Sequence, residues 1–423
     1  MQAYFDARET RPAAVREREL FERLPVVLAA ACEQAGAIAR QLRGVDIAEL
    51  TSREALACVP VLRKTELLQL QHAARIVASA GSAPAERERI FGGFSTVGWG
   101  AARRVFASPG PIYEPESARP DYWGFARALY ASGVRSGMLV YNCFSYHFTP
   151  AGSMMETAAH ALGCTVFPGG VGQTEQQVRA MADLAPHCYT GTPSFLRIIL
   201  ERADEMGVGL PLLRHALFSG EAYPPSLQAW FQQRGIAGFQ AYGSADLGMV
   251  AFETEARDGL VVNEDKIVEI VRPGTNQPVP DGDVGEVVVT TFNPDYPLLR
   301  FGTGDLSAFM PGQSPCGRTN IRIRGWLGRA DQTTKVRGMF VHPEQLARVL
   351  TRHPEILRAR LVVSGEAGHD VMTLRVESDA QVDVAALADT VREQTKLRAA
   401  IEILPSGALP NDGKVIDDVR RYE

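Results

Sequence analysis

The sequence lacks the features that would place a protein in a membrane, on a secretory route or on nucleic acid. No run of about 20 apolar residues occurs, so a membrane-spanning helix is not expected. The N-terminal residues are charged and contain no apolar signal core, which argues against secretion. Lys and Arg number 44 against 49 Asp and Glu, so no basic excess is available for nucleic acid or an anionic membrane. We therefore expect a cytoplasmic protein.

Nucleophile and metal motifs are also missing. The six cysteines are scattered and form no C-x-x-C pair, which favours reduced thiols over disulfides. Neither G-x-S-x-G nor H-E-x-x-H occurs. Residues 312–319 nearly match a phosphate-loop pattern, but an alternating strand follows instead of a helix, so a plain turn is expected.

The length of 423 residues exceeds what one hydrophobic core usually supports, so at least two domains are expected. Apolar segments alternate with helical patterns between residues 138 and 241, which favours a mostly parallel sheet covered by helices. The β-branched segments that follow are typical of antiparallel strands. The sequence therefore predicts an α/β fold. A large multilayer N-terminal domain would span residues 1–328, with a β-rich subdomain at about 250–328, and a small mobile α+β domain would span residues 329–423.

One internal stretch has almost no charge. Ser136–Thr174 carries a single formal charge, Glu156, although 22% of the chain is charged. Polar residues, glycines and prolines interrupt the stretch, so it is not a membrane span. Core packing in a central sheet explains part of it.

Four short motifs carry acids, glycines and a lysine in a fixed order. Residues 241–248 read Ala-Tyr-Gly-Ser-Ala-Asp-Leu-Gly, and residues 300–306 read Arg-Phe-Gly-Thr-Gly-Asp-Leu. Residues 328–331 read Gly-Arg-Ala-Asp, and residues 409–414 read Leu-Pro-Asn-Asp-Gly-Lys. Each alone could be an ordinary turn, since Asp after Gly is common in turns. Together, over nearly the whole chain, they resemble the adenylate-forming enzymes (acyl-CoA synthetases and adenylation domains), and within them the phenylacetate–CoA ligase-like branch.

The resemblance implies a nucleotide site. Asp305 matches the carboxylate that accepts both ribose hydroxyls, a pairing that suits the two carboxylate oxygens. Arg329 matches the basic residue near the ribose and the phosphate. The segments that would contact or stack on adenine are Ser219-Gly220-Glu221-Ala222 and Tyr242-Gly243-Ser244.

The resemblance also implies which groups act during the reaction. Lys414 matches the lysine that neutralises charge developing on the carboxylate and the α-phosphate. Asp246 matches the acid that serves Mg²⁺, although the family usually has a glutamate there, one methylene longer. Asp331 lies at or beside the hinge about which the small domain would rotate between two half-reactions.

The uncharged stretch has a place in the same resemblance. Residues 141–148 align with the aromatic segment that borders the acyl pocket, and residues 167–170 align with the next strand-end turn. An apolar pocket with few polar groups suits a small aromatic or other hydrophobic carboxylate. The expected pocket residues are Tyr146, His147, Phe148, Gly169 and Gly170.

The phosphate loop departs from the family pattern. The family has a Ser/Thr/Gly-rich run ending in Lys, whereas residues 106–116 here read Phe-Ala-Ser-Pro-Gly-Pro-Ile-Tyr-Glu-Pro-Glu. The three prolines remove backbone donors, and Glu114 and Glu116 place negative charge where a triphosphate needs positive charge. Ser108 is retained as an expected phosphate contact.

Three explanations of this loop stay open. Arg103 or Arg104 could hold the phosphates instead, the chain could use a different phosphoanhydride, or adenylation could be impaired. A second departure concerns zinc, which some phenylacetate–CoA ligase-like proteins hold through Cys and His residues. One soft ligand cannot complete a tetrahedral site, so we expect no zinc. The matching positions are Thr254, Val261, Ser314 and Cys316.

The leading expectation is an ATP-dependent acid–thiol ligase. It would activate a small aromatic or hydrophobic carboxylate as an acyl-adenylate and transfer the acyl group to coenzyme A, with Mg²⁺ as a further cofactor. No nucleic-acid or membrane partner is expected, and a homodimer is possible. Two alternatives remain: a degenerate relative that binds nucleotide or acyl-CoA without adenylation, and an enzyme that transfers AMP to a cofactor hydroxyl.

Overall fold

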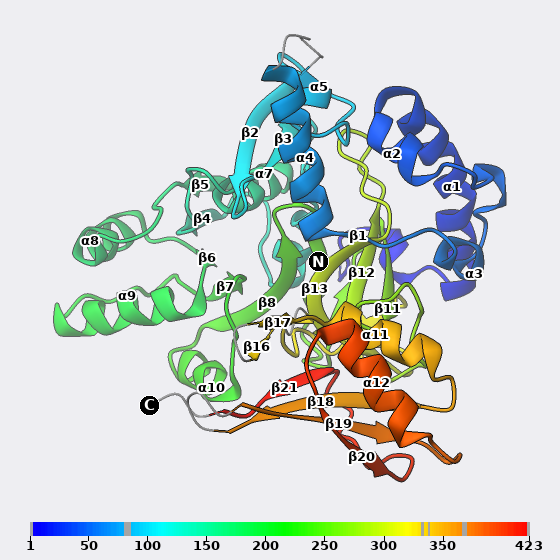
Figure 1. The fold of residues 1–423 in the computed structure, drawn as a ribbon. Coiled ribbons are helices and arrows are strands. Elements are labelled where there is room, and N and C mark those ends of the chain that lie inside the picture. The colour runs from blue at the N-terminus through cyan, green and yellow to red at the C-terminus, as the bar shows by residue number, and fades with distance from the viewer. Residues whose placement is uncertain (1–2, 80–85, 331–333, 337–338, 366–369, 421–423) are drawn as a thin grey trace. The chain divides into compact units, whose positions relative to one another are not determined.

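The computed structural model describes residues 3–79, 86–330, 334–336, 339–365 and 370–420 (Figure 1). The chain forms two compact units. The first contains Met1–Val268, Val289–Phe301 and Met310–Gly325, and the second contains Glu269–Val288, Gly302–Phe309 and Trp326–Glu423. The chain crosses between them within β11 (Lys266–Val271), β12 (Gly285–Thr291) and β13 (Phe301–Ser307). The mixed α/β class expected from the sequence is confirmed.

The domain boundary near residue 328 stays a prediction, and the compact units differ from it in one respect. Two stretches of the expected β-rich subdomain, residues 269–288 and 302–309, belong to the second unit. One reason is that Asn411 Oδ1 accepts a hydrogen bond from Val284 N at 3.1 Å. The local strand pattern of the sequence carries no information on such a long-range contact.

The first unit contains a nine-stranded sheet in the order β14-β15-β10-β9-β8-β7-β6-β4-β5. Strands β5, β4, β6, β7 and β8 pair in parallel, whereas β9, β10 and β15 pair antiparallel. Both pairing modes were expected: parallel pairing between residues 138 and 241, and antiparallel pairing in the β-branched segments that follow. The bounds are β4 Leu139–Asn142, β5 Thr165–Phe167, β6 Cys188–Gly191, β7 His215–Phe218, β8 Ala237–Ser244, β9 Gly248–Glu253, β10 Leu260–Val262, β14 Phe309–Met310 and β15 Arg322–Ile323.

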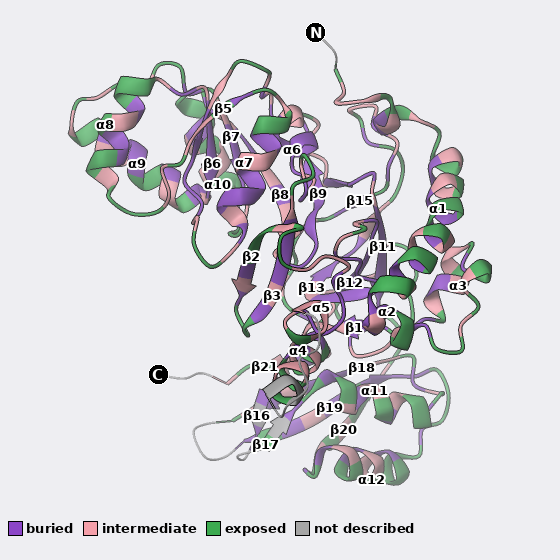
Figure 2. Ribbon diagram, turned by 90° about the horizontal axis from the view of Figure 1, so that it is seen from above, coloured by how far each residue is buried: buried purple, intermediate pink, exposed green. Residues whose placement is uncertain are grey.

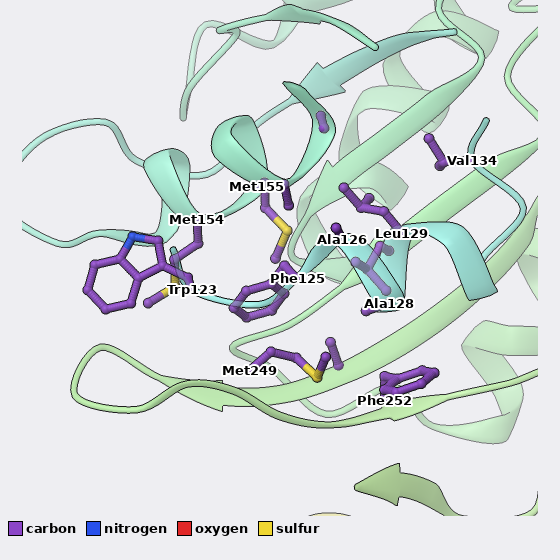
Figure 3. Close-up of a cluster of buried hydrophobic side chains, with 14 of the residues drawn as sticks. Trp123, Phe125, Ala126, Ala128, Leu129, Val134, Met154, Met155, Met249 and Phe252 are labelled. Atoms are coloured by element: carbon purple, nitrogen blue, oxygen red, sulfur yellow. The ribbon is translucent and has the colours of Figure 1, made fainter. Parts of the chain in front are cut away.

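Helices cover both faces of the parallel strands, because successive strand residues point to opposite sides. Val140 packs into one core with residues of α6 and α7, and Tyr141 packs into a second core with residues of α8 to α10. Figure 2 shows the buried strands between exposed helix surfaces, and Figure 3 shows the first core. These helices are α6 Ala126–Ala131, α7 Ala151–Ala161, α8 Thr174–Leu184, α9 Pro193–Glu205 and α10 Pro225–Gln233.

The N-terminal part of the first unit is largely helical, and its apolar residues recur at the three- and four-residue spacing of amphipathic helices. A two-stranded hairpin, β2 Ala102–Ser108 and β3 Ile112–Ser117, follows these helices. The remaining elements are η1 Ala7–Thr10, α1 Ala13–Gln34, α2 Gly36–Gln41, η2 Ile47–Glu49, α3 Arg53–Ala57, β1 Leu62–Arg63, α4 Lys64–Ser79 and α5 Glu86–Arg89.

The second unit has its own α+β core. Its four-stranded sheet has the order β20-β19-β18-β21, with α11 and α12 contributing Leu346 and Leu387 to the buried cluster. Across the described ranges, no helix combines the length and the apolar character needed to cross a bilayer. The bounds are β16 Thr334–Val336, β17 Met339–Val341, α11 Pro343–Arg352, β18 Arg358–Ser364, β19 Val371–Glu377, α12 Val384–Thr395, β20 Ala400–Leu404 and β21 Ile416–Asp418.

Candidate functional site

The connections of the parallel strands diverge between β4 and β6. From β4 the chain passes to β5 on one side, whereas β6, β7 and β8 follow on the other side. In open α/β sheets, ligands bind beyond the carboxyl ends of the strands at such a switch point. The loop after β4 contains Tyr146, and the loop after β6 contains Thr192. The expected acyl-pocket segment therefore lies where the sheet topology favours a ligand.

The loop between β4 and α7 holds its aromatic residues in different environments. Phe148 is 79% exposed and has a φ of 60°, a left-handed conformation uncommon for a bulky residue. Its carbonyl accepts a hydrogen bond from Ala107 N in β2 at 2.8 Å, which ties the loop to the hairpin. His147 Nδ1 lies 2.9 Å from Ser145 Oγ. Tyr146 is half-buried, and its hydroxyl accepts a hydrogen bond from Asn142 Nδ2 at 2.8 Å.

The glycine turn after β5 is attached to the end of β4. Gly170 N donates to Asn142 O at 3.0 Å, and Gln177 Nε2 donates to Gly169 O at 2.9 Å. A Cβ atom at Gly169 would lie 2.7 Å from Tyr141 Cε1, so only glycine fits against this ring. The structure thus brings together the two segments that the sequence assigned to one pocket wall.

The hairpin β2–β3 occupies the sequence position of the family's phosphate loop. Ser108 Oγ donates to Glu114 Oε1 at 2.5 Å, and Ser108 is only 3% exposed. Burial, together with the nearby carboxylate of Asp246, raises the pKa of Glu114 to about 8. The expected phosphate contact of Ser108 is not supported by this geometry, because its hydroxyl is already engaged.

Glu116 does not act as the expected exposed negative charge. It is buried, and Arg104 Nη1 donates to its Oε1 at 2.8 Å. Its Oε2 accepts hydrogen bonds from Trp123 Nε1 at 2.6 Å and from Ser153 Oγ at 2.5 Å. The hairpin therefore carries less negative charge toward solvent than its sequence suggested. Arg104, named from the sequence as a possible phosphate ligand, is engaged in this network.

The acid of the β8–β9 turn is buried and paired. Asp246 Oδ2 accepts a hydrogen bond from Lys64 Nζ at 2.9 Å, and Lys64 is the first residue of α4. Lys266 Nζ, which is buried, donates to Leu247 O at 2.7 Å and so supports the same turn. Lys64 was not identified from the sequence, because 182 residues separate it from Asp246 and no local pattern links the two.

A magnesium ion is compatible with the oxygen atoms that remain here. Asp246 Oδ1 and Glu114 Oε2 are buried, and neither has a hydrogen-bond partner in the described part of the chain. Mg²⁺ is typically bound by one or two carboxylates together with substrate phosphates. The described residues contain no group of three or more His, Cys, Asp or Glu side chains suited to a metal. The donor set thus fits a cation shared with a nucleotide better than a protein-only cage.

The expected adenine-contacting segments follow β7 and β8. Ser219 and Gly220 come directly after β7, and Gly220 has a φ of 80°. Glu221 Oε2 accepts a hydrogen bond from Ser194 N at 3.4 Å, at the start of α9. Tyr242 and Gly243 lie near the end of β8. These segments come from adjacent parallel strands, so the sheet places them at one edge.

In the second unit, Asp305 is engaged by two donors. Arg329 Nη1 donates to its Oδ1 at 3.0 Å, and Trp326 Nε1 donates to the same oxygen at 3.1 Å. A Cβ atom at Gly304 would lie 2.6 Å from Arg329 Nη2, so the glycine of this motif makes room for the guanidinium. The structure thus joins Asp305 to Arg329, as the resemblance implied. It adds Trp326, which is 56% exposed and was missed in the sequence despite lying three residues before Arg329.

Lys414 lies close to Arg329 within the second unit. Both residues line one cavity of about 350 Å³, together with Asp412, Asp417 and other residues. Lys414 Nζ contacts Asp417 Oδ1 at 3.0 Å, and Lys414 N donates to Asp412 Oδ1 at 3.0 Å. Asp331, the expected hinge, lies outside the described residues.

The positions matched to a zinc site form a hydrogen-bonded cluster and a core strand. Ser314 Oγ lies 3.1 Å from Cys316 Sγ, and Arg318 Nη1 donates to the sulfur at 3.5 Å. Burial alone would raise the pKa of Cys316, but hydrogen bonds from Ser314, Thr254 and Arg318 leave it below its usual value. Val261 packs in the first core. The absence of zinc stays a prediction.

Comparison with known proteins identifies the family. Residues 125–293 match the family of AMP-binding enzymes. The chain is 34% identical over 261 residues to a phenylacetate-coenzyme A ligase of Thermus thermophilus, covering 60% of this chain and 59% of that protein. It is 31% identical over 297 residues to the phenylacetate-coenzyme A ligase of Aromatoleum evansii, covering 66% and 67%. The chain belongs to the phenylacetate-coenzyme A ligase family of AMP-binding enzymes. The resemblance drawn from its motifs is thereby confirmed.

Similarity to solved members of the AMP-binding enzymes extends over most of the chain. A 2-hydroxyisobutyryl-CoA ligase in complex with 2-HIB-AMP and CoA matches with a TM-score of 0.72 at 25% identity, covering 97% of this chain and 92% of that chain. By sequence, the matched stretch spans about three fifths of the phenylacetate-coenzyme A ligase of Thermus thermophilus, at 59% of its length. Sequence identity to the phenylacetate-coenzyme A ligase of Aromatoleum evansii thus covers 66% of this chain, whereas the structural match to the 2-hydroxyisobutyryl-CoA ligase covers 97% of it.

Proposed function

We propose that the protein is an ATP-dependent ligase that converts a small aromatic or other hydrophobic carboxylate into its coenzyme A thioester through an acyl-adenylate. The observation that supports this most is the pairing of Arg329 and Lys414 on one cavity of about 350 Å³. Their motifs lie more than 80 residues apart in the sequence, and the fold brings them to one cavity whose lining also includes Asp412, Asp417 and Asp418. The names of the relatives, phenylacetate-coenzyme A ligases and a 2-hydroxyisobutyryl-CoA ligase, point to the same class of reaction.

Under this proposal the protein binds and orients the reactants and supplies no nucleophile of its own. Asp305 would accept the ribose hydroxyls, and Lys414 would stabilise negative charge at the α-phosphate. Asp246, with Glu114 beside it, would hold Mg²⁺, and this ion would neutralise phosphate charge when bound. Tyr146 and the glycine turn at Gly169 would form the wall of the acyl pocket.

The assay that tests this proposal is ATP–pyrophosphate exchange over a panel of aryl and short-chain acids. At least one acid should stimulate exchange, and mass spectrometry should then detect its CoA thioester after CoA is added. Absence of exchange with every acid, alongside measurable AMP binding, would identify the degenerate alternative. AMP attached to a cofactor hydroxyl would identify the AMP-transferring alternative. A homodimer remains a separate proposal, which light scattering tests.

The degenerate alternative is favoured by one observation. Ser108 is buried in the hairpin that replaces the phosphate loop and donates to Glu114, so its hydroxyl proton is not available to a triphosphate. Of the two arginines named from the sequence as possible phosphate ligands, Arg104 is bound to Glu116, whereas Arg103 is exposed on β2 and could contact phosphate. Arg103→Ala should therefore raise the KM for ATP if the hairpin borders the nucleotide.

Asp305→Asn is expected to weaken AMP binding by about tenfold or more, because hydrogen bonds to charged groups are stronger than neutral ones. Arg329 and Trp326 both contact Oδ1, which the asparagine retains, so the local structure should persist. Isothermal titration calorimetry with AMP measures the change. Asp379 is an exposed acid of the same unit, so Asp379→Asn serves as the control. An unchanged dissociation constant would remove Asp305 from the nucleotide site.

A further inference from the structure

An exposed tryptophan contacts the carboxylate that is expected to bind ribose. Trp326 is 56% exposed, although tryptophan side chains are highly buried on average. Its Nε1 donates a hydrogen bond to Asp305 Oδ1 at 3.1 Å. The indole N–H is the one polar group of this side chain, so the contact with Asp305 uses all of its hydrogen-bonding capacity. The exposed ring and its polar contact therefore point to a role at the site and not in the core.

The backbone places the tryptophan and the aspartate side by side. The chain that follows Trp326 runs antiparallel to the middle of β13, where Leu327 N donates to Leu306 O at 2.9 Å. In this pairing Asp305 and Arg329 form an antiparallel bridge. All of these residues belong to the second unit. The contact between the indole and the carboxylate is therefore fixed by main-chain hydrogen bonds within one compact unit.

Two donors hold the same carboxylate oxygen. Arg329 Nη1 donates to Asp305 Oδ1 at 3.0 Å, beside the N–H of Trp326. The terminal torsion of an aspartate is broad, so its hydrogen-bond donors set the plane of the carboxylate. Because both donors approach Oδ1, they also fix the direction in which Oδ2 points. A carboxylate oxygen has about two acceptor sites, so a ribose hydroxyl reaches Oδ1 only when one of the two donors leaves.

The two donors differ in what else they can bind. The side chain of Arg329 is 49% exposed, donates to Thr303 O at 3.4 Å and lines the cavity that contains Lys414. A guanidinium has five N–H donors, so it can turn toward a phosphate and still make hydrogen bonds. The indole of Trp326 has one donor on a rigid ring, and turning it away would leave Asp305 without this contact. Trp326 is therefore the donor suited to remain when a nucleotide is bound.

We propose that Trp326 is a positioning residue of the ribose site: its indole N–H keeps the Asp305 carboxylate in the plane that accepts a ribose diol while Arg329 turns toward the phosphate. Trp326 thereby contributes to the selection of ribonucleotides over nucleotides that lack the ribose hydroxyls. This inference rests on the proposed function, which assigns the ribose to Asp305, and adds a residue to that site. The contact is effective because a hydrogen bond to an ionised acceptor is roughly twice as strong as a neutral one.

The test compares AMP with 2′,3′-dideoxyadenosine monophosphate, which lacks both ribose hydroxyls. Isothermal titration calorimetry gives the two dissociation constants, and the ratio of the dideoxy value to the AMP value measures ribose recognition without turnover. In the wild type this ratio should exceed about 10, because a site built to hydrogen-bond a hydroxyl rejects a ligand that lacks it. Trp326→Phe removes the N–H and keeps an aromatic ring. It should lower the ratio about fivefold by weakening AMP binding alone.

Three comparisons separate positioning from packing or stacking. Trp99 is 50% exposed and packs edge-on against Phe91, so Trp99→Phe is the matched control and should leave both constants unchanged. In an Asp305→Ala background, Trp326→Phe should not weaken AMP further, because no carboxylate remains to be positioned. Replacing Trp326 with 3-benzothienylalanine exchanges the N–H for sulfur and keeps the bicyclic ring. This variant should repeat the effect of Trp326→Phe, and it replaces that variant should Trp326→Phe fail to fold.

Three results overturn the proposal. The first is an unchanged ratio in Trp326→Phe, and the second is an equal rise of both dissociation constants, which would indicate stacking on the base. The third is a wild type that binds AMP no better than the dideoxy nucleotide, or not at all, since there would then be no ribose recognition to support. Failure of the ligase proposal is seen separately, as absence of pyrophosphate exchange with every acid while AMP still binds. In that event the same binding ratios decide the role of Trp326.

Discussion

Lys414→Ala is expected to lower acid-dependent ATP–pyrophosphate exchange by about 10²–10³-fold, the usual effect of removing one group that stabilises developing negative charge. The side chain of Lys414 is 49% exposed and contacts Asp417, so its loss should change the thermal midpoint little. The expectation depends on the position of Lys414 beside Arg329 on one cavity. A lysine with only a surface ion pair would produce no such loss.

The second half-reaction provides the internal comparison. Formation of thioester from a synthetic acyl-adenylate and CoA should be affected far less by Lys414→Ala, because the thiol attacks the acyl carbon and the α-phosphorus is not attacked in that step. Arg375→Ala is the matched control, since Arg375 forms an exposed ion pair with Glu402 in the same unit. An equal loss in both half-reactions would show that Lys414 supports the structure of the site and has no specific role in adenylation.

Glu114→Gln is expected to change how the stability of the protein depends on pH. Burial and the Asp246 carboxylate raise the pKa of Glu114 to about 8 from its ordinary value of 4.5. A carboxyl group with a raised folded-state pKa stabilises the fold fully below its unfolded pKa, and this contribution is lost as the pH rises through the folded pKa. Between these limits the wild type should lose on the order of 1.4 kcal/mol per pH unit relative to the variant.

Thermal or urea unfolding of both proteins between pH 5 and 9 measures this difference. The variant keeps the size of the protonated side chain and a donor, so near pH 5 its stability should be close to that of the wild type. Glu116→Gln is the contrasting substitution. Glu116 pairs with Arg104 and accepts from Trp123 and Ser153, so its replacement should destabilise the protein across the whole range. Parallel pH curves for the wild type and Glu114→Gln would refute the buried, uncharged state of Glu114.

The sequence predicted the parallel strands well because each is a short apolar run between helices with a clear period. Strand β4, Leu139–Asn142, and helix α9, Pro193–Glu205, both lie in the stretch between residues 138 and 241 where apolar segments alternate with helical patterns. The antiparallel region was less regular. The alternating strand expected after residue 319 contains only Arg322–Ile323 (β15), since strand length depends on the partner strand β10.

Contacts between side chains were harder to predict from the sequence than helices and strands were. Glu116 was expected to repel a triphosphate because sequence spacing does not reveal that Trp123 and Ser153 donate to it. Lys64 and Asp246 are 182 residues apart, and only the fold makes them an ion pair. By contrast, Asp305 and Arg329 were correctly expected near one another, because the resemblance assigned both to the ribose. Their roles toward a ligand stay predictions.

The contacts of Glu116 also limit which sequences can replace the hairpin β2–β3. A Gly/Ser-rich run in place of residues 106–116 would remove the acceptor of Trp123 Nε1 and Ser153 Oγ and leave Arg104 without its buried carboxylate. Unsatisfied donors of this kind are costly in a core. Accommodating such a run would therefore need simultaneous replacements in β2, in α7 and at residue 123. The hairpin is thus held in place by the hydrogen bonds that Trp123 and Ser153 donate to Glu116, so its sequence is constrained by the stability of the core as well as by any contact with a ligand.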